Sequence, residues 1–204
     1  MAFAYTVASH LAYFDTPSAE FAARRPEIEY LGVGGYIFSQ DAELTGSHST
    51  SPPRILLLQR ALTDSMPGLW EGPGGAHEPE EDRTLLDGVV REVLEETGLH
   101  VSRFVELAGV DGWTHQQRDG RFIRIAKYSF IVEVYEGRRE VSGVSEVVPH
   151  EEISVVMEVG AHQAYKWAVE EEVKVSLETG VDKLTPHQGP NVLRAFDILN
   201  RGLK

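Results

Sequence analysis

The stretch from Gly72 to Leu99 constrains the fold most, because a glycine-rich turn is followed by a segment with clear helical periodicity. At about 100° per residue, the helical period, the aliphatic residues between positions 85 and 98 gather on one side of a helix. These residues are Leu86, Val89, Val90, Val93 and Leu94. Glutamates gather on a different side, at spacings of three and four residues: Glu92, Glu95 and Glu96. The pattern predicts an amphipathic helix that ends at Gly98.

The glutamates of this helix repel one another. Like charges at such spacings cost roughly 0.2–0.5 kcal/mol per pair in an isolated helix. Glu95 and Glu96 also lie near the helix C-terminus, where the helix dipole disfavours anions. One interpretation is a solvated acidic face that Arg91 partly relieves. The other is a site for a divalent cation, because Mg²⁺ and Mn²⁺ take carboxylate oxygens as ligands.

The flanking residues favour the cation site. Arg91-Glu92-Val93-Leu94-Glu95-Glu96-Thr97-Gly98-Leu99 follows the tight turn Pro73-Gly74-Gly75, and Trp70-Glu71-Gly72 precedes that turn. This arrangement resembles the Nudix box, which reads G, five residues, E, seven residues, then R-E-U-x-E-E-x-G-U with U bulky and aliphatic. The second half of the box is matched at every fixed position, and Gly75 and Glu81 have the spacing of the first half. The chain therefore resembles the Nudix hydrolases.

One departure from the family pattern lies before the helix. Nine residues, Asp82 to Val90, separate Glu81 from Arg91, where the pattern has seven. We interpret this as a turn that is two residues longer and leaves the helix unchanged. The role of Glu81 is then open: another acid of the turn stands in for it, or the role is lost. The alternatives are Glu78, Glu80 and Asp82.

The resemblance implies an α/β fold, a Nudix-type α/β/α sandwich with a mixed β-sheet, which agrees with the irregular mixture of strand and helix patterns. We expect a single domain over residues 1–204, with a core at about 30–180 and helical extensions at both ends. Helices are predicted at 15–27, 85–98, 189–202 and in the second part of 164–180. Strands are predicted at 30–39, 54–61, near Trp70, in 100–116, at 121–137 and partly in 144–159, with an exposed loop at 40–53.

The resemblance also implies roles for individual residues. Glu92, Glu95 and Glu96 are expected to bind Mg²⁺ or Mn²⁺, with the carbonyl group of Gly75 as a further ligand. Glu92 or Glu95 is expected to deprotonate the attacking water. Arg91 is expected to orient Glu92 or Glu81 by a charge-assisted hydrogen bond. The catalytic candidates are thus Glu92, Glu95 and Arg91.

A further acid often comes from outside the box in this family. Relatives often carry Glu-His before an aromatic-rich strand, where this chain has Ala161-His162. The substitute candidates are Glu151, Glu152 and Glu158.

Aromatic side chains are the candidates for substrate binding, because their faces can stack on a nucleobase. The candidates are Trp70, Trp113 and Tyr36, and ordinary packing is the alternative for each. Basic residues that could hold a phosphate, or else be solvated strand residues, are Arg60, Arg118, Arg121, Arg124 and Lys127. His77 follows the glycine turn and could touch the substrate or have no role.

Composition limits the partners. Acidic residues outnumber basic ones by 32 to 19, and the formal net charge is -13, which disfavours nucleic acids and anionic membranes. Without cysteine, thiolate metal sites, disulfides and cysteine nucleophiles are excluded. No apolar run approaches 18 residues, and the N-terminus lacks the basic region of a signal peptide, so we expect a cytoplasmic protein.

The resemblance leads to a divalent-metal-dependent pyrophosphohydrolase that cleaves a nucleoside diphosphate linked to another moiety. Two alternatives remain: a hydrolase of a non-nucleotide organic diphosphate, such as an isoprenyl diphosphate, and a Nudix-like binding or regulatory module with little catalysis. The expected partner is a small-molecule diphosphate. The terminal helices are expected either to close the sheet or to support a homodimer.

Overall fold

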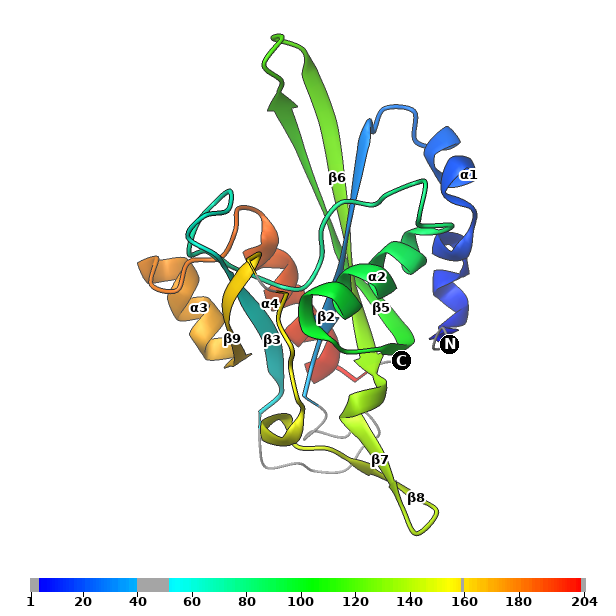
Figure 1. Cartoon of the computed structure of the whole chain (residues 1–204), viewed down its shortest axis with the longest axis vertical. Coiled ribbons are helices and arrows are strands. Elements are labelled where there is room, and N and C mark those ends of the chain that lie inside the picture. Colours follow the sequence, from blue (N-terminus) through cyan, green and yellow to red (C-terminus); the bar gives the residue numbers. More distant parts are fainter. Residues whose placement is uncertain (1–3, 40–51, 159, 203–204) are drawn as a thin grey trace.

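The computed structural model describes residues 4–39, 52–158 and 160–202 (Figure 1). Its largest sheet has the strand order β1-β5-β6-β2. β5 and β6 form a long antiparallel hairpin, whereas β1 pairs with β5, and β2 with β6, in parallel. The sheet is therefore mixed, as predicted. Its strands are β1 (Thr6–Val7), β2 (Tyr30–Ile37), β5 (Val101–Gln116) and β6 (Phe122–Val134).

A second, antiparallel sheet has the order β4-β3-β9 and is joined to the first by a bridge between Phe38 and Ile55. Its strands are β3 (Arg54–Arg60), β4 (Trp70–Glu71) and β9 (His162–Val169). A separate hairpin of β7 (Arg138–Val141) and β8 (Val144–Val147) extends from the end of β6 (Figure 1).

Helices cover both sides of these sheets. One hydrophobic core joins α2 (Leu85–Thr97) and the N-terminal helices η1 (Ser9–Asp15) and α1 (Ser18–Ala23) to the large sheet. The other core joins α3 (Glu170–Thr179) and α4 (Gln188–Asn200) to the opposite side. Two further 3-10 turns are η2 (Tyr135–Gly137) and η3 (His150–Glu152). This α/β/α arrangement confirms the predicted fold class.

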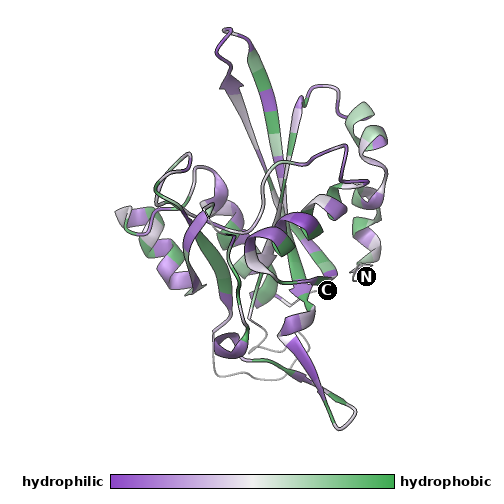
Figure 2. Ribbon diagram, in the orientation of Figure 1, coloured by the Kyte–Doolittle hydropathy of each residue, from purple (hydrophilic) through white to green (hydrophobic). Residues whose placement is uncertain are grey.

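The strands between the cores are buried on both faces, which explains their continuous apolar runs. In β2, Val33 and Ile37 face the core under α2, whereas Tyr36 faces the core under α4. In β3, Leu56 packs in the first core and Ile55 in the second. Figure 2 shows hydrophobic colour through the central strands, and a mixture of hydrophobic and hydrophilic residues along the helices.

The helix α2 is held by its ends and by close packing on β2. Thr84 caps its N-terminus by accepting the Asp87 N–H at 3.1 Å, and Gly98 ends it with a left-handed φ of 69°. A Cβ atom at Gly35 would lie 2.7 Å from Val93, so the glycine lets the helix approach the strand closely. The buried stripe therefore runs along β2.

The predicted apolar face of α2 was wrong at one residue, because Leu94 is 41% exposed. Counted at about 100° per residue, Leu94 lies about 140° from the fully buried Val89, whereas Glu96 lies only about 20° from it. Glu92 and Glu96 are accordingly 8% exposed each. The glutamates of interest thus lie beside the buried stripe rather than opposite it.

Other elements differ from the sequence prediction in extent. The helix expected at 15–27 is shorter and begins at Ser18, after Pro17, and the segment 101–116 is one continuous strand. Most of the loop predicted at 40–53 lies outside the described residues. No helix in the described part of the chain is long and apolar enough to cross a membrane.

Candidate functional site

The glycine turn before α2 runs along β2 and pairs with it like a short strand. The N–H groups of Gly35 and Val33 donate to the carbonyl groups of Pro73 and Gly75, each at 3.0 Å. Gly74 has a φ of 142°, and a Cβ atom there would lie 2.3 Å from the Val33 carbonyl oxygen. Only glycine fits this position, and the turn is fixed against the sheet. The Gly75 carbonyl, a predicted metal ligand, keeps one lone pair beyond its bond to Val33.

Glu96 lies directly against this turn. The Gly74 N–H donates to its Oε2 atom at 2.7 Å. Burial raises the pKa of Glu96 to about 7, and the charges of Glu92 and Glu71 add to this, while His162 and the bond from Gly74 oppose it. A negative charge at Glu96 is therefore costly unless a cation lies nearby.

Glu92 contacts the same turn one residue further on. A Cβ atom at Gly75 would lie only 2.7 Å from the Oε2 atom of Glu92, so the carboxylate fills the space that the glycine leaves. Burial raises the pKa of Glu92, and the neighbouring Glu95 adds to this, while Arg91 lowers it. The glycine turn thus contacts two carboxylates, Glu92 and Glu96, from adjacent turns of α2.

Arg91 connects the glutamates to the longer turn. Its Nε and Nη2 atoms donate to the two oxygens of Asp82, each at 3.0 Å. Its Nη1 atom contacts Glu92 at 2.9 Å and Glu95 at 3.1 Å. Burial works against the ionised form of Asp82, but the bonds from Arg91 and Glu78 outweigh it and hold its pKa below the usual range. Asp82 therefore takes the place beside Arg91 that the pattern left open.

The other acids of the turn stay outside this contact. Glu78, Glu80 and Glu81 are all exposed, whereas Asp82 is 2% exposed. Glu95 also differs from its neighbours on α2, because its side chain is 51% exposed and its described ion pair is with Arg91. Glu92 and Glu96 meet at the glycine turn, and Glu95 stands on the solvent side of the same group.

Two buried residues that the sequence reasoning missed complete the site. Glu71 is 3% exposed, forms an ion pair with Arg60, and its Oε1 atom lies 3.6 Å from the Nε2 atom of His162. The same His162 nitrogen lies 3.8 Å from Glu96. Burial opposes the charge on Glu71, but His162, Lys127 and Arg60 together hold its pKa below the usual value. Glu71 thus places a carboxylate beside the histidine of Ala161-His162, the pair that lacks an adjacent acid.

His162 stands between the two carboxylates of Glu71 and Glu96. Its ring nitrogens are buried, and neither has a hydrogen-bond partner among the described residues. Burial disfavours its charged form, but the two carboxylates outweigh burial and raise the pKa of His162. The only sequence signal for this contact was that Glu71 directly precedes the glycine turn.

The donor set fits a hard divalent cation with few protein ligands. Within residues 4–39, 52–158 and 160–202, no group of three or more His, Asp or Glu side chains is arranged to hold a metal ion. Mg²⁺, however, keeps several waters and is usually bound through one or two carboxylates and substrate phosphates. Glu92, Glu96 and the carbonyl groups of the turn supply such oxygens in an acidic, buried place. The residues present therefore fit an ion of this kind.

A cationic side chain lies at the edge of the turn. Lys127 extends from β6, and its Nζ atom donates to the Gly74 carbonyl at 3.3 Å. Opposite Lys127 in the β5–β6 hairpin is Asp111. Of the other predicted phosphate-binding residues, Arg60 is paired with Glu71 of the site. Exposed positions on or near the hairpin tip hold Arg118, Arg121 and Arg124.

The predicted stacking residues lie in three different environments. Tyr36 is 1% exposed in the core and offers no face to a ligand. Trp70 is buried, with the Lys166 Nζ atom 4.5 Å from its ring centre. Trp113 is half-buried on β5, and its ring is nearly parallel to that of His187, with the centroids 5.9 Å apart and an interplanar angle of 11°.

The predicted substitute acids are exposed and hold other partners. Glu151 lies 3.2 Å from His150, and Glu152 lies 2.7 Å from Arg139 of the β7–β8 hairpin. Glu158 is also exposed. None of them has a described contact with Glu92 or Glu96.

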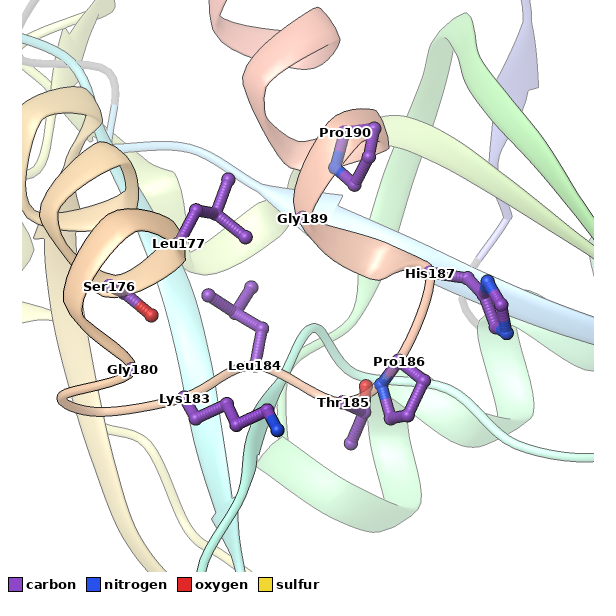
Figure 3. Close-up of a pocket in the computed structure, with 10 residues that line it drawn as sticks. All are labelled: Ser176, Leu177, Gly180, Lys183, Leu184, Thr185, Pro186, His187, Gly189 and Pro190. Carbon is purple, nitrogen blue, oxygen red and sulfur yellow. The ribbon is translucent and has the colours of Figure 1, made fainter.

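The connection between α3 and α4 is tied to the start of the glycine turn. Trp70 N–H donates to the Lys183 carbonyl at 2.9 Å, and Gly72 N–H donates to the Gln188 side chain at 3.0 Å. A cavity of about 190 Å³ lies along this connection. Figure 3 shows its lining residues, with Leu177 and Leu184 pointing toward one another. No acidic residue lines it, so this cavity is separate from the carboxylates.

Comparison with known proteins identifies the arrangement. Residues 41–178 match the NUDIX domain family. The human m7GpppN-mRNA hydrolase NUDT17 is 51% identical over 53 residues, which are 26% of this chain and 16% of that protein. The match thus spans less than a fifth of the relative's length.

Solved structures agree with this fold. The NUDIX hydrolase from Nitrosomonas europaea has a TM-score of 0.52 at 17% identity, covering 82% of this chain and 88% of its own. The NUDIX domain of Shewanella oneidensis NrtR, complexed with ADP ribose, has a TM-score of 0.52 at 16% identity, covering 89% and 98%. At such identities the likeness concerns the fold alone. Because the family match covers more than half of the chain, the protein belongs to the Nudix family.

Proposed function

We propose that the protein is a divalent-cation-dependent hydrolase that cleaves the pyrophosphate linkage of a nucleoside diphosphate joined to another moiety. The observation that carries this proposal is the meeting of Glu92 and Glu96 at the turn of Gly74 and Gly75. Both carboxylates have raised pKa values there, and Arg91 donates a hydrogen bond to Glu92. A cation and an anionic diphosphate together would balance these charges.

Glu92, Glu96 and the Gly75 carbonyl would hold Mg²⁺ or Mn²⁺, and Glu95 is the further predicted ligand. When bound, such an ion promotes ionisation of water and neutralises charge that develops on phosphate oxygens. Arg91 keeps Glu92 and Glu95 at a fixed separation by bonding both through one nitrogen. The Nζ atom of Lys127, beside the Gly74 carbonyl, is placed to contact a phosphate oxygen.

A proton must leave the attacking water, and Glu92 or Glu95 accepts it. The two differ in their surroundings: Glu92 is buried against the turn, and the side chain of Glu95 is half exposed. A glutamate that mainly binds the cation affects cation affinity and rate together when it is replaced. A glutamate that mainly accepts the proton lowers the rate and leaves cation affinity nearly unchanged.

Trp113 is our candidate for binding the nucleobase. It shares one face of the hairpin with Asp111, two residues away along β5, and Asp111 lies opposite Lys127. The ring of His187 is nearly parallel to that of Trp113, and His187 has a left-handed φ of 75°, which is unusual outside glycine. This surface, aromatic and polar, favours a nucleotide over an isoprenyl chain. The core position of Tyr36 removes it from this role, and Trp70 stays a weaker candidate behind Lys166.

The names of two relatives point in the same direction. One is described as an m7GpppN-mRNA hydrolase, and the other structure contains ADP ribose. We therefore propose a small nucleotide compound as substrate, a single catalytic domain over residues 1–204, and a cytoplasmic location. A homodimer is the proposed assembly to test by light scattering.

A substrate panel tests the proposal. Purified full-length protein is incubated with ADP-ribose, a dinucleoside polyphosphate, an mRNA cap analogue and an isoprenyl diphosphate, each with Mg²⁺, Mn²⁺ or EDTA. We expect cation-dependent cleavage of at least one nucleotide compound, measured by chromatography of the products. Cleavage of only the isoprenyl compound contradicts the nucleotide assignment. Binding of a nucleotide without cleavage under any cation contradicts the enzyme and supports a regulatory module.

A further inference from the structure

The N-terminal segment outside the family match contacts the longer turn before α2. Ser18, the first residue of α1, donates its backbone N–H to the Arg83 carbonyl at 2.8 Å. Its neighbour Pro17 forms a bridge with Thr84, the cap of α2. The end of the turn is therefore held by residues that precede position 41, where the family match begins.

The Ser18 side chain joins two further parts of this turn. Its Oγ atom lies 2.8 Å from the Nε2 atom of His77 and 3.0 Å from the Asp82 carbonyl oxygen. Both Ser18 and His77 are 7% exposed. A carbonyl oxygen only accepts, so the Ser18 hydroxyl donates to Asp82, and His77 must then donate its Nε2–H to Ser18. Only this assignment satisfies both short contacts.

His77 is itself held by the sheet. Its backbone N–H donates to the Leu31 carbonyl of β2 at 2.9 Å. The contact from His77 through Ser18 to Asp82 therefore connects β2, α1 and the longer turn. It fixes both ends of residues 78–82, which lead into the longer turn.

Asp82 needs this support because its carboxylate is closely surrounded and has little room to move. The Glu78 N–H donates to its Oδ2 atom at 2.8 Å, and Arg91 bonds both of its oxygens. A Cβ atom at Gly88 of α2 would lie 2.8 Å from the same Oδ2 atom, so the carboxylate packs against the bare helix backbone. A small displacement of the Asp82 backbone would break the paired contact with Arg91.

We infer that Ser18 and His77 are positioning residues for the cation and diphosphate site. They fix the longer turn so that Asp82 holds Arg91, and Arg91 in turn fixes Glu92 and Glu95. The kinetic part of this inference rests on the proposed function. The structural part concerns Arg91 alone and stands without it.

The test compares hydroxyl removal at two neighbouring positions of the full-length protein. Ser18→Ala removes the contact to His77 and Asp82. Thr16→Ala is the matched control, because the Thr16 hydroxyl bonds only the Tyr13 carbonyl among the described contacts, at 2.9 Å. At the second position, His77→Leu removes the donor, and His77→Gln restores an N–H donor near the original Nε2 atom.

Five quantities are measured: hydrogen exchange of the Arg91 Nε–H by NMR, Mn²⁺ affinity without substrate by electron paramagnetic resonance, kcat, KM and thermal stability. Residues that orient the ligands of a cation typically affect affinity or rate by about 10–100-fold. For Ser18→Ala and His77→Leu we expect at least 10-fold faster Arg91 exchange, and a loss of about 10-fold in Mn²⁺ affinity or kcat, with a small change in KM. Thr16→Ala and His77→Gln should stay within about 3-fold of the wild type.

The outcomes separate the two proposals. Wild-type exchange of the Arg91 Nε–H in both Ser18→Ala and His77→Leu overturns the positioning role, whatever the activity. If the wild type neither binds Mn²⁺ nor cleaves any substrate, the proposed function is contradicted. Faster Arg91 exchange in Ser18→Ala and His77→Leu would still support the structural inference in that case. Equal losses in Thr16→Ala and Ser18→Ala, with equal falls in thermal stability, also overturn it, because they indicate a general effect of the N-terminal segment.

Discussion

The backbone N–H of Gly74 donates to the Glu96 carboxylate at 2.7 Å, and this contact joins the glycine turn to the acidic helix. It places a buried carboxylate at a turn that itself offers carbonyl groups. The arrangement stores an unfavourable charge, because burial raises the pKa of Glu96 to about 7. Under the proposed function, a bound cation would offset this cost, so the carboxylate that serves the function lowers the stability of the metal-free protein.

Glu96→Gln should make the metal-free protein more stable and the enzyme inactive. A carboxyl group whose pKa is raised on folding contributes stability below its unfolded value of 4.5 and loses it as the pH rises through about 7. Above that pH the penalty is at most about 3 kcal/mol, and the amide avoids it. Urea denaturation in EDTA at pH 8 should show the gain, and at pH 4 it should be absent. A Glu96→Gln variant that is no more stable than the wild type at pH 8 contradicts the prediction.

Asp82→Asn should destabilise the protein by about 1.5–3 kcal/mol at pH 7, because it removes the paired carboxylate of Arg91 and leaves only Glu92 and Glu95 as its described acidic partners. The pKa of Asp82 is lowered on folding, so its contribution is complete above its unfolded value of 3.8 and is lost as the pH falls further. The difference between variant and wild type should therefore shrink in acid. The control Glu81→Gln, at an exposed position, should change the free energy of unfolding by less than about 0.5 kcal/mol. Equal effects of the two substitutions would exclude Asp82 as the partner of Arg91.

Gly74→Ala should be more damaging than Gly120→Ala, although both glycines have positive φ angles of 142° and 85°. A Cβ atom at Gly74 meets the Val33 carbonyl oxygen at 2.3 Å, whereas at Gly120 it meets nothing within 4 Å. Backbone strain alone costs on the order of 1–3 kcal/mol, and only Gly74 adds a steric clash. Thermal unfolding of the two variants, at equal concentration, measures the difference. Similar midpoints would contradict the close approach of the turn to β2.

Glu71→Gln should lower the pKa of His162. Burial favours the neutral imidazole, and the nearby carboxylates of Glu71, 3.6 Å from Nε2, and of Glu96 raise the pKa against it. Without the Glu71 charge, burial has less opposition. NMR titration of the His162 ring protons in metal-free protein measures the change, with His115, an exposed histidine, as an internal control. An unchanged His162 titration excludes the contact between these residues.

Trp113→Ala should raise KM for the preferred nucleotide and leave kcat within about 3-fold. Loss of stacking on one base typically costs about 1–3 kcal/mol, which corresponds to roughly 5- to 150-fold in affinity. Phe122→Ala is the control, because this aromatic side chain lies on the same hairpin but is 61% exposed and on the other face. A fall in kcat with unchanged KM would contradict a role in base binding.

The sequence was sufficient for the fold class and for the residues of the acidic helix, because these depend on local periodicity and on a motif with fixed spacing. It was insufficient where a contact joins distant segments. Glu71 and His162 are 91 positions apart, and antiparallel pairing of β3 with both β4 and β9 brings them together. No single-sequence pattern contains that pairing.

The choice among the acids of the longer turn was equally out of reach. Asp82 differs from Glu81 by one position, and its place depends on contacts with the distant Ser18, Gly88 and Arg91. For Tyr36 and Leu94, the sequence predicted an environment that the structure contradicts. Tyr36 was a candidate for ligand contact, but it is buried in the core under α4. Leu94 was assigned to the buried face of α2, but the orientation of the helix leaves it exposed.

The strand β2 has a practical consequence for anyone who produces this protein in pieces. It occupies Tyr30–Ile37, before the region recognised by family similarity, yet it supplies the edge on which the glycine turn lies. A fragment that starts at residue 41 would leave β6 with an open edge and the turn without its backbone partners. Such a fragment should aggregate or misfold. The boundaries of the family match are therefore a poor guide to the shortest fragment that folds.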